Sequence, residues 1–306
     1  MASFRSQLRV RKEYMLDKKK IIHSFFKDRT GVLATKHKKE EVIAPILEKE
    51  LGVKIIVPEN FDTDKYGTFT RDIERMGNQL EAARHKAEAA MDVTDKSLGF
   101  SSEGTFGSHP IVPFLPFNRE IVLLLDRETG LEVVGVATTS ETNNNHRYVN
   151  TFQEAYEFSL KAGFPDHGVV IKVREHIRDQ SEMIKGITNK EELKEAFDFI
   201  LKKSDSGEIF IETDMRALYN PKRMKNIAEA ARDLVEKIYK LCPKCSWPGF
   251  ELIERKKGLP CEWCGNATEL ILSVIYRCKK CGYEEERFYP KGKEKADPGS
   301  CQYCNP

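Results

Sequence analysis

The sequence predicts a mixed α/β protein, in which a central mixed sheet is flanked by helices and a small cysteine-rich module follows. Two observations predict this class. Short apolar segments alternate with amphipathic helical patterns between residues 31 and 241, and all eight cysteines lie beyond residue 241. We therefore expect an N-terminal helical extension over residues 1–28, an α/β domain over residues 29–241 and a cysteine-rich module over residues 242–306.

The start of the α/β domain has the pattern of a β-α-β unit. An apolar strand is expected over residues 31–35, an amphipathic helix over 41–51 that Gly52 ends, and a second apolar strand over 53–57. Continuously apolar strands are typical of buried parallel strands, and the connection is long enough for a right-handed crossover. This unit predicts the parallel part of the central sheet.

The remaining elements of the domain follow from the same periodicities. Residues 97–103 are expected to form a strand that runs into a glycine-punctuated turn, and residues 121–125 and 131–138 an antiparallel hairpin. The other expected elements are helices over 79–91, 151–162, 190–202 and 221–241 and strands over 168–173 and 208–212.

The cysteines form four Cys-x-x-Cys pairs. They are Cys242/Cys245, Cys261/Cys264, Cys278/Cys281 and Cys301/Cys304. Two thiolates at this spacing hold one metal ion, and four complete the closed tetrahedral shell that Zn²⁺ prefers in structural sites. The module is therefore expected to be ribbon-like and to hold two zinc ions, with sequential and cross-braced pairing both open. A closed shell has no position for a substrate, so we expect a scaffold or docking surface.

Disulfides are the alternative for these cysteines, and they require an oxidising compartment. The N-terminal residues lack the apolar core of a signal peptide. No apolar run approaches the roughly 18 residues of a membrane-spanning helix. We expect a soluble, cytoplasmic protein with no membrane partner. The 50 basic and 48 acidic residues nearly balance, which argues against bulk electrostatic binding of nucleic acid but allows a local patch.

Polar residues gather after several predicted strands, where ligands bind in open α/β sheets. The candidate site residues are Lys36, His37, Lys38, Lys39, Asp62, Asp64, Glu103, Asp214, Arg216 and Arg223. Lysines at a helix start can hold phosphate, carboxylates can hold Mg²⁺, and arginine can clamp phosphate. The structural alternatives are a solvated charge run, helix caps or Asx turns, and an ion pair of Asp214 with an arginine. His109 and His167 have the pattern of structural histidines.

Two resemblances follow from short motifs. Residues 34–40, 62–64, 67–69, 102–107, 212–216, 220–221 and 297–306 together resemble a bacterial domain family of unknown function. Residues 31–140 more distantly resemble the nucleoside-triphosphate pyrophosphatases of the inosine-triphosphatase type, on Ala34 and Thr35, the carboxylate loop, and the segments 81–90 and 98–104.

The second resemblance implies an activity. It implies an α/β fold in which Glu103 and the Asp62/Asp64 loop hold Mg²⁺, which activates water to attack a phosphoanhydride. Lysines near residue 36 and Arg216 would then neutralise the oxyanions. His37 and Glu40 stand where that family usually has asparagine and lysine, so its phosphate-binding lysine would be Lys38 or Lys39 here.

The sequence thus predicts a Mg²⁺-dependent phosphohydrolase acting on a nucleotide or related phosphorylated small molecule. The alternative is a binding protein whose zinc module contacts nucleic acid or a protein without catalysis. Its contact residues would be Lys279, Lys280, Arg287, Lys291, Lys293, Trp247, Trp263, Tyr283 and Tyr289. A third hypothesis is that the module mediates assembly while the α/β domain senses a ligand.

Overall fold

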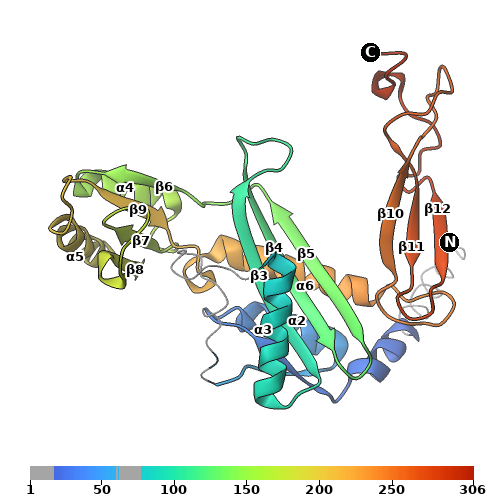
Figure 1. Ribbon diagram of the computed structural model, residues 1–306, viewed down its shortest axis with the longest axis horizontal. Helices are drawn as coiled ribbons and strands as arrows, with labels where there is room; N and C mark the ends of the chain where they lie inside the picture. The colour runs from blue at the N-terminus through green and yellow to red at the C-terminus, as the bar shows by residue number, and fades with distance from the viewer. Residues whose placement is uncertain (1–16, 60, 62–76) are drawn as a thin grey trace, which may run out of the picture. The chain divides into compact units, whose positions relative to one another are not determined.

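The computed structural model describes residues 17–59, 61 and 77–306, so Asp62 and Asp64 lie outside the described residues. The chain divides into two compact units (Figure 1). The α/β unit is Phe26–Val235, and the cysteine unit combines the described part of Met1–Phe25 with Glu236–Pro306. The predicted mixed α/β class with a C-terminal cysteine module is confirmed.

A five-stranded mixed sheet forms the centre of the α/β unit, in the order β2-β1-β3-β4-β5. Its strands are β1 (Thr30–Ala34), β2 (Lys54–Ile56), β3 (Leu98–Ser108), β4 (Pro116–Asp126) and β5 (Leu131–Thr139). β1 pairs in parallel with both β2 and β3, whereas β3, β4 and β5 are antiparallel. The predicted β-α-β unit and the predicted hairpin are both present.

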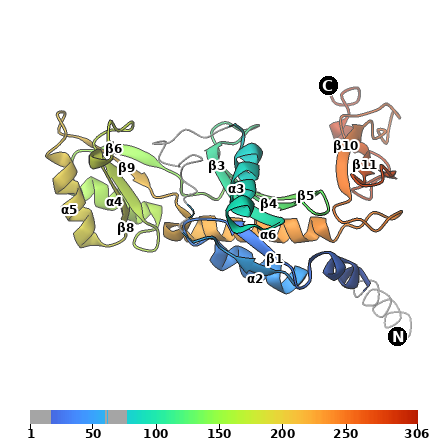
Figure 2. The same ribbon diagram turned by 60° about the horizontal axis from the view of Figure 1, so that its bottom comes forward.

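Helices cover both faces of this sheet (Figures 1 and 2). α3 (Gln79–Thr94) lies on one face, and α2 (Glu40–Leu51) and α6 (Pro221–Ile238) lie on the other. α2 ends at Gly52 in the left-handed conformation, as the sequence predicts. α6 packs so closely on β5 that a Cβ at Gly135 would lie 2.1 Å from the Ala230 carbonyl oxygen.

β3 corrects one sequence prediction. Residues 104–107 were expected to form a glycine-punctuated turn, but the strand continues through them to Ser108. Every residue of β3 is in register with β4, from Leu98 opposite Asp126 to Ser108 opposite Pro116. This continuous ladder outweighs the weak strand preference of glycine. Glu103 therefore lies within a strand.

A partly buried ion pair ties the start of β1 to the end of β4. Arg29 donates to both carboxylate oxygens of Asp126 at 2.8 Å, and Thr129 donates to the same carboxylate at 2.7 Å. Burial alone would raise the pKa of Asp126, but the hydrogen bonds from Arg29 and Thr129 lower it overall. This contact spans β3 and sets the position of β1.

The remaining strands of the α/β unit form a separate four-stranded antiparallel sheet, in the order β6-β9-β7-β8. Its strands are β6 (His146–Val149), β7 (Val169–Lys172), β8 (Met183–Ile187) and β9 (Ile209–Thr213). α4 (Phe152–Ala162) and α5 (Lys190–Leu201) pack on its apolar residues. The prediction of one sheet was therefore wrong for β7 and β9.

β6 and β8 were not predicted, because their patterns carry little apolar signal. β6 is largely exposed, and β8 contains Lys185 and Gly186. Short 3₁₀ helices lie at Gln180–Glu182, Ala217–Tyr219 and Pro298–Ser300.

The cysteine unit is built on a three-stranded antiparallel meander, β10 (Glu251–Lys257), β11 (Ile271–Arg277) and β12 (Glu284–Phe288). Residues 17–26 are helical, and Phe25 contacts Trp247 edge-on with ring centroids 5.3 Å apart. None of the helices in the described part of the chain combines the length and apolar character needed to cross a lipid bilayer.

Candidate anion site and metal centres

Charged side chains are buried in the α/β unit near the point where β1 ends and β3 continues. The last pairing of these strands is Ala34 with Ser101, so Ser102 is the first residue of β3 beyond the end of β1. Five charged residues are at most 9% exposed here, and we call them the charge cluster: Lys39, Lys86, Glu103, Glu120 and Arg223. Buried charges require partners, so their contacts determine what this region can bind.

Two ion pairs lie on opposite faces of the sheet. α3 brings Lys86 to Glu103, and α6 brings Arg223 to Glu120 with its Nε 2.8 Å from the carboxylate Oε1. Gly104 makes the second pair possible, because a Cβ there would lie 2.3 Å from the same oxygen. Each carboxylate thus has a cation in contact.

Lys39 is the third cation of the charge cluster. It directly precedes α2, and its Nζ donates to the Ser102 carbonyl oxygen at 3.2 Å. The pKa of Lys39 is lowered from 10.5 to about 8; burial is the largest cause, Arg223 adds to it, and Glu103 and Glu120 oppose the shift. Among the described residues, the charge cluster therefore holds three cations and two carboxylates, and Lys39 is the cation that contacts no carboxylate.

The other residues of the lysine-rich turn stay outside the charge cluster. Lys36 and His37 are half-buried, and Lys38 is exposed and pairs with Glu41 at 3.7 Å. His37 and Lys38 both have left-handed backbone angles, with φ of 67° and 62°. Two such residues in succession are unusual without glycine and turn the chain so that Lys39 points inward.

Asp214 and Arg216 form a pair of their own. The Arg216 guanidinium lies 2.6 Å from an Asp214 carboxylate oxygen and stacks over the Tyr219 ring at 4.6 Å. This is the ion pair that was the structural alternative for these residues. They follow β9, which is antiparallel and belongs to the second sheet, so they do not lie at the carboxyl end of a parallel strand.

The structure thus brings together Lys39, Glu103 and Arg223 of the predicted residues, and adds Lys86 and Glu120. Both additions have a sequence signal. Lys86 falls on the helical face of the buried alanines, and Glu120 alternates with Val122. A charged residue at an otherwise apolar position indicates a buried pair.

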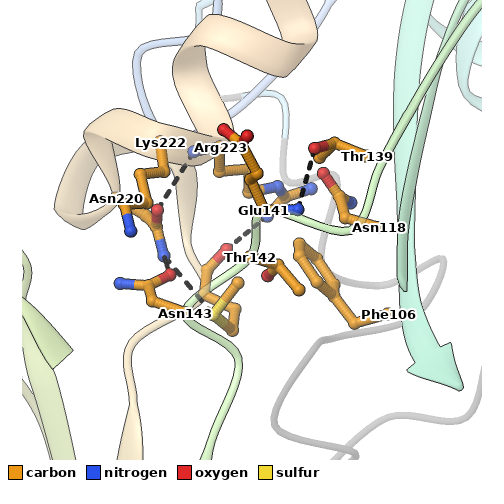
Figure 3. Close-up of a pocket in the computed structure, with 10 residues that line it drawn as sticks. Phe106, Asn118, Thr139, Glu141, Thr142, Asn143, Asn220, Lys222 and Arg223 are labelled. Carbon is orange, nitrogen blue, oxygen red and sulfur yellow. Dashed lines mark hydrogen bonds between the residues drawn. The ribbon is translucent and has the colours of Figure 1, made fainter. Parts of the chain in front are cut away.

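A small hollow lies beside Arg223, where the linkers between the two sheets cross (Figure 3). It encloses about 180 Å³, including solvent at its mouth, and Phe106, Asn118 and Lys222 line it. Asn220 on one linker donates to Asn143 on the other at 2.9 Å. Arg223 therefore connects the buried charge cluster with this hollow.

The two histidines predicted to be structural hold backbone groups. His167 Nε2 accepts from the Lys222 amide at the start of α6, at 3.4 Å, and burial lowers its pKa. His109 Nδ1 accepts from the amides of Ile111 and Val112 at 3.2 Å. Neither belongs to the charge cluster.

The eight cysteines form two groups of four that can hold metal ions, and none is in a disulfide. The groups are Cys242, Cys245, Cys278 and Cys281, and Cys261, Cys264, Cys301 and Cys304. The nearest sulfur atoms of different pairs are 3.6 to 3.9 Å apart. Tetrahedral Zn²⁺ with bonds of about 2.3 Å separates its sulfurs by about 3.8 Å, so the donors fit this ion.

The pairing is cross-braced: the first Cys-x-x-Cys pair shares a site with the third, and the second with the fourth. The meander explains this order. β10, β11 and β12 each carry the chain from one end of the sheet to the other between consecutive cysteine pairs. Consecutive pairs therefore lie at opposite ends, and only alternate pairs can meet.

Three of the four metal-binding turns share a backbone conformation. The residue after the second cysteine is Ser246, Gly265 or Gly282, each with φ between 57° and 72°. Its amide donates to the carbonyl of the first cysteine at 2.9 to 3.0 Å. This left-handed position suits glycine and directs both sulfurs of a pair to one side.

Comparison with known families places most of the chain in one of them. Residues 86–306 match the family described as "Domain of unknown function (DUF6671)". The chain belongs to this family. The predicted resemblance to a family of unknown function is therefore confirmed, whereas no curated protein matches and the resemblance to inosine-triphosphatase-type enzymes stays a prediction. The match covers every cysteine and the charge cluster except Lys39.

Cross-braced pairing can be tested with two double variants. Cys245→Ser with Cys281→Ser removes two thiolates from one site, so we expect one zinc per chain to resist a chelator as it does in the unmodified protein. Cys245→Ser with Cys264→Ser leaves three thiolates in each site, so both ions should be lost more readily. Zinc analysis after chelator challenge distinguishes them, and the reverse result would indicate sequential pairing.

Proposed function

We propose that the α/β unit is a Mg²⁺-dependent phosphohydrolase that acts on a nucleotide or a related phosphorylated small molecule. The observation that carries the proposal is the excess positive charge of the charge cluster. Three cations face two carboxylates, and Lys39 has a backbone carbonyl as its partner in place of a carboxylate. A buried ammonium that contacts no carboxylate is costly, and a phosphate oxyanion would supply a negative charge in contact with it.

The carboxylates of the charge cluster suit a metal that the ligand shares. Mg²⁺ usually binds one or two carboxylates together with substrate phosphates and water. Glu103 offers one such carboxylate, whereas Glu120 is on the opposite face of the sheet. Within the described ranges the cysteine sites are the only groups of three or more metal-ligating side chains. Asp62 and Asp64 lie outside those ranges and remain predicted ligands.

The proposed reaction gives the side chains different tasks. Bound Mg²⁺ would polarise the phosphate and lower the pKa of a water molecule. Lys39 and Arg223 would neutralise charge that develops on the phosphoryl oxygens. Glu103 would accept the proton of the attacking water, and the contact with Lys86 would hold this carboxylate in position. A new P–O bond forms as the anhydride P–O bond breaks.

Glu103→Gln should lower phosphate release from a nucleotide panel by at least about 100-fold, because it removes the proton acceptor. The matched control is Glu132→Gln, which disrupts another pair between α3 and the sheet, Arg84 with Glu132 at 2.8 Å. We expect the control to retain activity and both variants to retain their zinc. Unchanged turnover in Glu103→Gln would remove this residue from the mechanism.

The charge of Lys39 predicts a pH dependence of ligand affinity. Its pKa is lowered to about 8, so the ammonium is present below that pH and lost above it. Affinity should therefore be flat up to about pH 8 and then fall. Lys39→Met should weaken binding about 10- to 100-fold and abolish this fall, whereas the exposed neighbour Lys38→Met should do neither. Calorimetry between pH 7 and 9.5 measures both effects.

We also propose that the cysteine unit holds two structural Zn²⁺ ions and docks single-stranded nucleic acid. Most of the predicted contact residues are engaged within the unit: Lys279 pairs with Glu251 at 2.9 Å, and Lys280 covers Trp247. Trp263 and Tyr303 favour docking instead, because they are 78% and 64% exposed. The thiolate sites support a reducing compartment, in keeping with a cytoplasmic location.

The two aromatic side chains are held by one metal site. Each directly precedes the second cysteine of its pair, and both pairs belong to the same group of four. Neither ring has a ring contact with any residue that the structure describes. Lys291, Lys293 and Lys295 are exposed in a neighbouring segment. A hydrogen bond of 3.0 Å from the Glu262 amide to the Ala296 carbonyl oxygen connects this segment with the turn that carries Trp263. Exposed rings beside lysines suit base stacking and phosphate contact.

Replacing both Trp263 and Tyr303 by alanine should weaken binding of a mixed single-stranded oligonucleotide by at least about tenfold, since each stacked base contributes roughly 1–3 kcal/mol. The control is Phe288→Ala, an exposed aromatic residue on β12. Fluorescence anisotropy at several salt concentrations measures the affinity. Equal affinity of all three proteins, or no salt dependence, would contradict this docking role.

A further inference from the structure

The hydroxyl of Ser102 is buried without a partner. Ser102 is 2% exposed, and its Oγ has no hydrogen bond to any residue that the structure describes. The adjacent Ser101 is also buried, but its Oγ donates to the Ala83 carbonyl oxygen at 2.6 Å. Because successive strand residues point to opposite faces, Ser101 faces α3 and Ser102 faces the side of α2 and α6.

An unsatisfied buried hydroxyl is costly and uncommon in native structures, so its presence indicates a partner that binds later. Two other buried atoms in the described chain lack a hydrogen bond, His23 Nε2 and Arg174 Nε. Neither belongs to a residue of the charge cluster. Ser102 differs from them because Lys39, the cation of the charge cluster that contacts no carboxylate, donates to the Ser102 backbone carbonyl.

Lys39 provides the second observation. Its ammonium has three N–H donors, and the Ser102 carbonyl is their one hydrogen-bond acceptor among the described residues. The unused N–H donors of Lys39 and the unpartnered Ser102 hydroxyl therefore both lie by residue 102, the first residue of β3 beyond the end of β1. A neutral ligand could satisfy the hydroxyl but would leave the excess positive charge uncompensated.

We infer that Ser102 Oγ and Lys39 Nζ form an oxyanion subsite that takes a phosphoryl group of the ligand. This inference rests on the proposed function and adds to it one contact of the ligand, at the edge of β3 that lies beyond the end of β1. Ser102 Oγ is on the face of Gly104, Glu120 and Arg223, and the Lys86–Glu103 pair is on the face of α3, so a ligand that meets Ser102 and Glu103 lies at this edge. Ser102 donates to a phosphoryl oxygen and acts as a positioning residue that takes no proton.

The test compares two neighbouring serines, with inorganic pyrophosphate and Mg²⁺ as the probe. Ser102→Ala removes a hydroxyl that has no partner in the ligand-free protein, so the melting temperature should stay equal or rise. Its affinity for pyrophosphate should fall roughly 10- to 100-fold, as for loss of one hydrogen bond to a charged group. Ser101→Ala should show the opposite pattern, with a lower melting temperature and unchanged affinity.

The outcomes separate this inference from the function on which it rests. If unmodified protein binds pyrophosphate but Ser102→Ala binds it equally well, the subsite is wrong and the proposed function stands. A fall in melting temperature as large as that of Ser101→Ala would also overturn it, because Ser102 would then have a structural partner. Binding of malonate as tight as that of pyrophosphate would overturn the phosphoryl assignment. If no phosphorylated compound binds the unmodified protein, the proposed function itself fails.

Discussion

Burial of an uneven set of charges beyond the end of β1 is the constraint on which the α/β unit depends. Removing one partner of a buried ion pair typically costs about 3–5 kcal/mol, because it leaves a charge uncompensated. α3 supplies Lys86, α6 supplies Arg223, and the turn before α2 supplies Lys39. The charge cluster therefore forms only when three helices and the sheet are in register, and Lys39 is its one cation without a carboxylate in contact among the described residues.

The cysteine unit needs a different source of stability. The two outer strands of its sheet, β10 and β12, are largely exposed, and its apolar cluster is small, centred on Phe250 and two cysteines. Ion pairs such as Lys256 with Glu286 cross between strands, but exposed pairs contribute little stability. A sheet of this kind needs another source of cohesion. Metal bound at both ends would supply it, so folding and metal binding are expected to be coupled in this unit.

Family membership and side-chain geometry bear on function in different ways. The family match begins at Lys86 and carries no activity. The charge cluster combines residues inside the match, such as Glu103 and Arg223, with Lys39, which precedes it. Function must be argued from such a site because one fold can support many reactions. The unmatched β1–α2 segment therefore matters to the proposed activity as much as the matched region.

The sequence by itself determined the class, most helices and strands, and the eight metal-binding cysteines. Local periodicity and the Cys-x-x-Cys spacing act over short stretches of chain, so they can be detected without a structure. The sequence did not reveal the weakly apolar strands β6 and β8. It also did not reveal the division into separate sheets, because strand pairing is a long-range property.

Only the tertiary structure decided which charged residues meet. Lys38 and Lys39 are indistinguishable in sequence, yet one is exposed and the other is buried with its pKa lowered to about 8. Likewise, Arg216 has a local partner in Asp214, whereas Arg223 reaches across to Glu120. The same holds for the cysteine pairing, which depends on strand length and direction. These outcomes depend on contacts between residues distant in sequence, which a pattern of neighbours does not contain.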